Sequence, residues 1–148
     1  MSGRSVEIRI GLGSCGIAAG AEAVRAALER EARQAGAGVV VKAVGCNGMC
    51  HREPLVEVVE AGGGSTLYGN VTAEAARSIV RRHVLPRPLS TRLRWTTDRM
   101  AGLFRRNGSR PELGEHRVDR ERGGAAGFLR KQERIVLENC GEIDPRNI

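Results

Sequence analysis

Three cysteines stand in two glycine-rich loops, and their residue type and spacing suit metal binding. Cys15 belongs to the first loop, which spans residues 11–16, and Cys46 and Cys50 belong to the second, which spans residues 45–51. In a reducing compartment, clustered cysteines serve a metal or catalysis more often than a disulfide. The pattern therefore predicts one iron–sulfur or metal site, or the remnant of one, with the two loops as its walls.

The elements around these loops explain how distant thiols would meet. Cys15 is expected at the start of a helix, where free N–H groups and the helix dipole favour a thiolate. Cys46 and Cys50 follow the second strand, and loops that follow adjacent parallel strands lie at the same edge of a sheet. Gly45 and Gly48 would let the backbone approach and donate N–H groups to inorganic sulfide.

Hydrophobic periodicity predicts an α/β domain with a mixed sheet. The expected strands cover residues 6–12, 39–44, 54–60 and 65–68, and the expected helices cover residues 17–35 and a segment that begins after the capping residue Thr72. The order is β-α-β-β-β-α over residues 5–84. A helix between the first two strands implies a right-handed parallel crossover, and the last two strands form an antiparallel hairpin.

The rest of the chain reads as attached segments. We expect a compact domain at 1–85, a basic linker at 86–127 that is partly helical or flexible, and a short C-terminal segment at 128–148. Residues 1–80 carry eight basic and eight acidic side chains, whereas residues 81–134 carry fifteen and six. Because aromatic residues for base stacking are scarce, the basic excess favours a solvated or docking segment and no nucleic-acid partner.

Membrane insertion and secretion are not expected. No apolar run approaches the roughly 20 residues of a membrane span. The first residues lack an apolar signal region. A cytoplasmic protein is therefore the expectation.

The first loop also satisfies a dinucleotide-binding pattern, with Gly11, Gly13 and Gly16 between a strand and a helix. That fingerprint requires an acidic residue near the end of the second strand to hold the ribose. Here the second strand runs into Ala43, Val44 and Gly45, and a hairpin continuation is not a doubly wound sheet. The glycines are better explained by a tight turn.

Four stretches of the sequence resemble known proteins: GSCGIAAGA at 13–21, GCNGMCHREPLV at 45–56, YGNVT at 68–72 and KQERIVLENCGEIDP at 131–145. Together with the element order, the chain resembles the thioredoxin-like [2Fe-2S] ferredoxin family. More narrowly, it resembles the N-terminal region of NADH-binding flavoprotein subunits of NADH dehydrogenases, NAD-linked hydrogenases and formate dehydrogenases, and electron-bifurcating complexes. The last stretch resembles the entry to their flavin domain.

The resemblance implies a [2Fe-2S] cluster with Cys15, Cys46 and Cys50 as metal ligands. Relatives use four cysteines, and the slot for the missing one, near Ile10 or Gly11, has no thiol. The fourth ligand would be His51, Cys140 or an outside group, with a solvent-facing loop favoured for His51 and ordinary packing for Cys140. No FMN or NAD site is expected in this chain, because it stops where that domain would start.

The sequence thus predicts an electron-transfer or docking subunit of a multisubunit NADH-linked oxidoreductase, not catalytic alone. Its partners would be a flavin- and NADH-binding subunit and other iron–sulfur subunits. One alternative is a structural adaptor without a cofactor. A second is a small zinc module that uses Cys15, Cys46, Cys50 and His51. Thiol redox chemistry is a weaker alternative, because no C-x-x-C motif is present.

Overall fold

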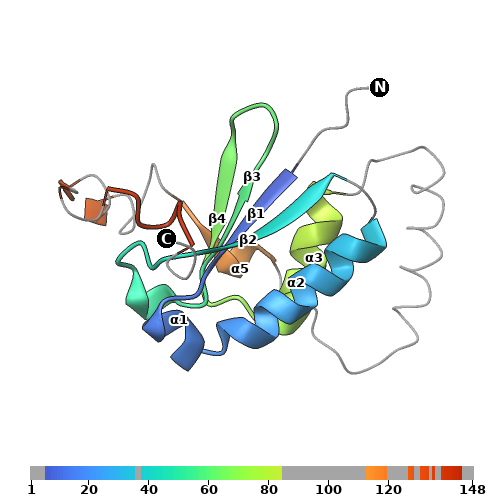
Figure 1. The fold of residues 1–148 in the computed structure, drawn as a ribbon, viewed down its shortest axis with the longest axis horizontal. Helices are drawn as coiled ribbons and strands as arrows, with labels where there is room; N and C mark the ends of the chain where they lie inside the picture. Colours follow the sequence, from blue (N-terminus) through green and yellow to red (C-terminus); the bar gives the residue numbers. More distant parts are fainter. Residues whose placement is uncertain are drawn as a thin grey trace.

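The structure, a computed structural model, describes residues 6–35, 38–84, 113–119, 127–128, 131–133, 135 and 138–144. Within these ranges, a five-stranded mixed sheet has the strand order β2-β1-β3-β4-β5 and packs against helices (Figure 1). The predicted α/β class and the β-α-β-β-β-α order are confirmed. No helix in the described part of the chain combines the length and the apolarity that crossing a membrane requires.

The first two strands form the predicted parallel pair. Strand β1 (Val6–Gly11) runs beside β2 (Val39–Val44) in a register that starts at Val6 and Val39 and ends at Gly11 and Val44. The connection between them is helical, as expected, but it is not the single helix predicted over 17–35. Helix α1 (Ser14–Ala18) starts earlier, and α2 (Ala21–Ala35) follows after a break. Gly20 lies in that break with a φ of 89°, a conformation that ends a helix and suits glycine.

The hairpin predicted after the second loop is present. Strand β3 (Val56–Val59) pairs antiparallel with β1 on one side and with β4 (Ser65–Tyr68) on the other. Strand β3 is shorter than the predicted 54–60. Pro54 has no N–H to offer a neighbouring strand, and the N–H of Leu55 donates to the Glu53 carboxylate instead.

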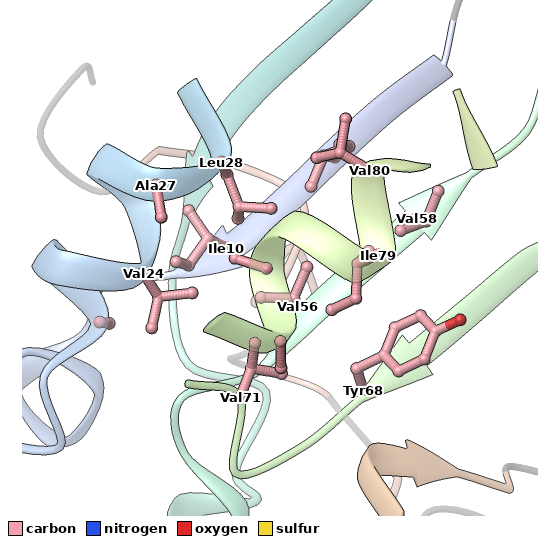
Figure 2. Packing of buried hydrophobic residues seen from close by; sticks show 14 of the residues in the cluster. Ile10, Val24, Ala27, Leu28, Val56, Val58, Tyr68, Val71, Ile79 and Val80 are labelled. Atoms are coloured by element: carbon pink, nitrogen blue, oxygen red, sulfur yellow. The ribbon is translucent and has the colours of Figure 1, made fainter. Parts of the chain in front are cut away.

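Helices α2 and α3 (Ala73–His83) cover one face of the sheet (Figure 1). The predicted cap is confirmed, since the Thr72 hydroxyl accepts a hydrogen bond from the backbone N–H of Ala75. The core between helices and sheet is aliphatic apart from one tyrosine (Figure 2), and its labelled members are Ile10, Val24, Ala27, Leu28, Val56, Val58, Tyr68, Val71, Ile79 and Val80. This layer holds β1 firmly, and β1 leads into the first cysteine loop.

A fifth strand joins the sheet from a segment for which no strand was predicted. Residues Leu113–His116 form the short helix α5, and β5 (Arg117–Val118) pairs antiparallel with β4. Val118 closes a second small cluster with Met49, Leu55 and Leu67. Because successive strand residues face opposite sides, Leu67 and its cluster lie on the face away from Tyr68 and the helices.

Residues 86–112 of the linker that we expected to be partly helical lie outside the described residues. The division into segments at 1–85, 86–127 and 128–148 stays a prediction, although residues 113–118 do contact the sheet.

Candidate metal centre

Both cysteine loops leave the sheet at the same edge, as predicted from the parallel pair. Gly11 and Val44 are the last paired residues of β1 and β2. Directly beyond them, the N–H of Leu12 donates to the carbonyl of Val44 over 2.8 Å. Figure 1 shows α1 beside the turn that follows β2. The crossover topology therefore brings residues far apart in the chain to one rim.

The two thiols of the second loop stand close enough to serve one metal ion. Cys46 Sγ and Cys50 Sγ are 3.8 Å apart. Two thiolates on one tetrahedral ion, each about 2.3 Å from it, also stand roughly 3.8 Å apart. The backbone N–H of Gly48 donates to Cys46 Sγ over 3.3 Å, which stabilises negative charge on that sulfur.

The second loop has a rigid conformation between its cysteines. Met49 is fully buried and anchors the loop in the small cluster on the far face of the sheet. The Asn47 side chain accepts a hydrogen bond from the Met49 N–H, and Gly48 has a φ of 93°. Only glycine adopts such a φ without strain, so the sequence between the two thiols specifies this turn.

Cys15 lies in the first turn of α1, and its thiol lies beside that of Cys50. A hydrogen bond with the Cys50 thiol is the largest cause that raises the pKa of Cys15, and the Glu53 carboxylate adds to the effect. A backbone hydrogen bond at the helix start lowers the pKa of Cys15, as expected, but these neighbours act in the opposite direction and the pKa is raised overall. The thiol is exposed, however, and so is that of Cys50.

The glycines of the first loop allow close packing between the loops. A Cβ on Gly13 would stand 3.2 Å from Cys46 Cβ, and a Cβ on Gly16 would stand 2.4 Å from the Gly11 carbonyl oxygen. Gly13 has an ordinary φ of −69°. The glycines of the G-x-G-x-x-G pattern thus allow close contacts that a side chain would block. This explains them better than the tight turn that we expected.

Glu53 is a site residue that the sequence reasoning missed. It is only 7% exposed and lies between the two loops, beside the Cys46 thiol. Burial is the main cause that raises the pKa of Glu53, and burial also raises the pKa of Cys46 to about 12. In the sequence, Glu53 looks like any other acidic residue in a loop, and nothing in the local pattern predicts that it is buried.

The remaining candidates lie at the outer side of the second loop. The His51 ring is exposed and meets Phe128 edge to face, with 6.3 Å between ring centroids. Cys140 is half-buried in a turn that packs on the loop. There the carbonyl of Ile143 accepts a 3.1 Å hydrogen bond from the N–H of Gly45, so this N–H already has a partner in the protein.

No three His, Cys, Asp or Glu side chains in the described ranges are arranged to hold a single metal ion. A [2Fe-2S] cluster makes a different demand, because its four protein ligands are shared between two irons. The Cys46–Cys50 pair has the spacing for one iron, and Cys15 adjoins this pair. The donor set therefore fits a two-iron cluster better than one ion, with one ligand still to be identified.

Comparison with known proteins finds one curated relative. The chain is 32% identical over 79 residues to subunit HndB of the NADP-reducing hydrogenase of Solidesulfovibrio fructosivorans. The chain is similar to a hydrogenase subunit. The alignment covers 53% of this chain and 63% of the relative, so it spans less than two thirds of the relative's length. The relative belongs to a hydrogenase, and hydrogenases are among the enzymes named by the sequence resemblance. No protein-family model matches the chain.

Two solved structures of a thioredoxin-like [2Fe-2S] ferredoxin from Aquifex aeolicus are also similar to the chain. The wild-type structure at 1.5 Å resolution has a TM-score of 0.47 and 21% identity, and the similarity covers 54% of this chain and 85% of that one. A second structure has a TM-score of 0.49 and 18% identity, with 56% and 86% covered.

Proposed function

We propose that this chain is an electron-transfer and docking subunit of an NADH- or NADPH-linked oxidoreductase complex, and that Cys15, Cys46 and Cys50 hold a [2Fe-2S] cluster. The observation that carries the proposal is the meeting of the two cysteine loops at one edge of the sheet. There the Cys46 and Cys50 sulfurs are 3.8 Å apart, and the neighbouring Cys50 thiol raises the pKa of Cys15. Similarity to a hydrogenase subunit supports the oxidoreductase role.

The cluster would supply one-electron redox chemistry, and the chain would hold it and set its environment. Cys46 and Cys50 would bind one iron, and Cys15 would bind the other. The Gly48 N–H already points at the Cys46 sulfur, and hydrogen bonds to sulfur are one means by which a protein tunes cluster potential. Because Cys15 and Cys50 are exposed, a redox partner that docks at this rim would come close to the cluster.

The partners that we propose are a flavin- and NADH-binding subunit and other iron–sulfur subunits. The sequence at 131–145 resembles the entry to a flavin-binding domain, and described residues of this stretch pack on the second cysteine loop. Gly141 approaches Asn47, and Gln132 approaches Gly48. A domain attached through this stretch would therefore lie near the cluster loop.

A structural adaptor without a cofactor is the second candidate. It is favoured by one observation, namely the absence of a thiol near Ile10 or Gly11, where the resemblance leads us to expect a fourth cysteine. The zinc alternative gains no support, because the described residues offer no three-ligand set for one ion and His51 faces solvent and Phe128.

Anaerobic purification of the full chain, followed by iron, zinc and acid-labile sulfide analysis, tests the proposal. We expect two irons and two sulfides per chain and, after reduction, an electron paramagnetic resonance signal of a [2Fe-2S] cluster. Cys46→Ser should abolish both. Cys140→Ser removes the thiol outside the two loops and should change neither. Wild-type protein that is colourless and free of iron would exclude the relay role and favour the adaptor.

A further inference from the structure

The slot expected for the missing thiol is near Ile10 or Gly11, and neither residue carries a ligand atom in its side chain. Ile10 is fully buried in the core between sheet and helices. Because strand residues alternate between faces, Gly11 projects away from that core. A Cβ built on Gly11 would stand 3.0 Å from Glu53 Oε1 and 3.1 Å from Oε2. The Glu53 carboxylate therefore occupies the space that a cysteine side chain at position 11 would enter.

The position of this carboxylate is fixed, and one of its oxygens is free. Oε2 accepts a 2.8 Å hydrogen bond from the backbone N–H of Leu55. Oε1 is buried and has no hydrogen-bond partner among the described residues. The Cys46 thiol adjoins the carboxylate without making a well-formed hydrogen bond to Oε1. A buried oxygen that lacks a partner costs about 1–3 kcal/mol, and more when it is charged, so such an atom needs a reason.

The surroundings offer no cation to balance this group. In the described part of the chain, none of the ion pairs involves Glu53, and no basic side chain is among the causes of its pKa shift. The other buried carboxylate, Glu31, differs in this respect because it pairs with Arg77 over 2.9 Å. Glu53 instead lies among cysteine thiols: it adjoins Cys46, and its charge acts on Cys15.

We propose that Glu53 is the fourth protein ligand of the cluster, with its carboxylate in the space that a side chain at position 11 would enter. This inference rests on the proposed function. The Cys46–Cys50 pair has the spacing for one iron, so Cys15 and Glu53 form the pair for the second. A carboxylate has the same charge as a thiolate but is a harder ligand. The cluster is then held by three sulfurs and one oxygen, which distinguishes it spectroscopically from a cluster held by four thiolates.

Variants of the full chain test the ligand directly. Glu53→Gln keeps the shape of the side chain and an oxygen for the Leu55 N–H, but it removes the anionic ligand. We expect it to lose iron to a chelator at least about tenfold faster than wild type. Glu31→Gln is the matched control, since it neutralises an equally buried carboxylate on α2, and it should behave as wild type. Glu53→Cys should retain two irons and show the spectrum of a cluster held only by thiolates.

Iron-edge X-ray absorption of wild-type protein gives a readout that does not depend on how a variant folds. We expect one oxygen ligand per cluster from the protein, absent in Glu53→Cys. The proposal is overturned if Glu53→Gln matches wild type in iron content, spectrum and rate of iron loss. It is also overturned if wild type and Glu53→Cys have the same first coordination shell, or if Cys140→Ser or His51→Ala loses the cluster while Glu53→Gln keeps it. Wild-type protein that binds no iron defeats the proposed function itself, which is a separate outcome.

Discussion

The hydroxyl of Tyr68 lies 2.8 Å from Nε2 of the His83 ring, and Nδ1 of the same ring lies 2.9 Å from Glu60 Oε1. These two contacts join strand β4, the last turn of α3 and the segment after β3. Tyr68 is 1% exposed, so its hydroxyl depends on His83 for a partner. The contacts therefore fasten the C-terminal end of α3 to the sheet, through β4 and through the residue that begins the β3–β4 hairpin turn.

The first prediction concerns this contact. Tyr68→Phe keeps the ring in the core but leaves His83 without its partner, so we expect a loss of about 1 kcal/mol in the free energy of unfolding at pH 7. Urea unfolding followed by circular dichroism measures it. His83→Ala in the Tyr68→Phe background should then cost less than His83→Ala alone, because the shared hydrogen bond is already gone. Equal costs in the two backgrounds contradict a coupled pair.

We also expect the difference in stability between wild type and Tyr68→Phe to depend on pH. Burial raises the pKa of Tyr68 above its ordinary value, so the folded state holds the phenolic proton more tightly than the unfolded chain. The stability that Tyr68 contributes is complete below the unfolded pKa of about 10, and it is lost as the pH rises toward the folded pKa. The difference in stability between wild type and Tyr68→Phe should therefore shrink above about pH 10. A difference that grows with pH contradicts the assigned cause.

The second prediction compares two glycines of the cysteine loops. A Cβ on Gly16 would stand 2.4 Å from the Gly11 carbonyl oxygen, which is backbone and cannot turn aside, whereas a Cβ on Gly45 has open space. We expect Gly16→Ala to destabilise the fold by about 1–3 kcal/mol through overpacking. Gly45→Ala is the matched control and should change stability by less than about 0.5 kcal/mol. The midpoints of urea unfolding measure the stability of the two variants. Similar midpoints would contradict the close contact at Gly16.

The sequence alone was sufficient to predict four of the five strands and the meeting of the two loops, for physical reasons. Alternation in β1 and the apolar run of β2 define strands, and a helix between them imposes a parallel crossover. The parallel pairing of Gly11 with Val44 then follows, and with it the common edge for Cys15, Cys46 and Cys50. These features depend on periodicity, which is a local property of the chain.

Features that depend on contacts between distant residues were not predictable. The pairing of β5 with β4 joins Val118 to Leu67 across a long separation. The break between α1 and α2 is a different case, since it was missed although it lies at a local glycine, Gly20. The burial of Glu53 arises because Gly11 and Gly16 leave room for a carboxylate between the loops. Secondary-structure propensity does not predict such a space, because the space depends on which loops approach one another.

The third prediction concerns the link between α2 and α3. Arg77 Nε donates to Glu31 Oε1 over 2.9 Å, and the Glu31 side chain is nearly buried while that of Arg77 is half-exposed. Arg77→Met keeps much of the aliphatic contact but leaves the carboxylate unpaired, so we expect a loss of about 1 kcal/mol. Adding Glu31→Leu should recover part of this loss, because it replaces the unpaired, nearly buried charge by an apolar side chain. Thermal unfolding of the single and double variants measures this, and additive losses contradict the link.

The fourth prediction concerns the thiols of the metal-free protein. Burial raises the pKa of Cys46 to about 12, and only the thiolate reacts with iodoacetamide. At pH 8 we therefore expect Cys46 to be alkylated at least about tenfold more slowly in the folded chain than in the denatured chain, where its pKa returns to about 8.5. Mass spectrometry of the labelled peptides measures both rates.

The half-buried Cys140 is the control for simple access, because it has a comparable degree of exposure but lies outside the two loops. If Cys46 and Cys140 are protected equally, restricted access explains the result and the raised pKa is not needed. If Cys46 alone is slow, its thiol is neutral near pH 8, and a metal that binds there must displace a proton that the folded chain holds tightly. Metal uptake should then become faster as the pH rises, which the same protein can show by iron or zinc titration.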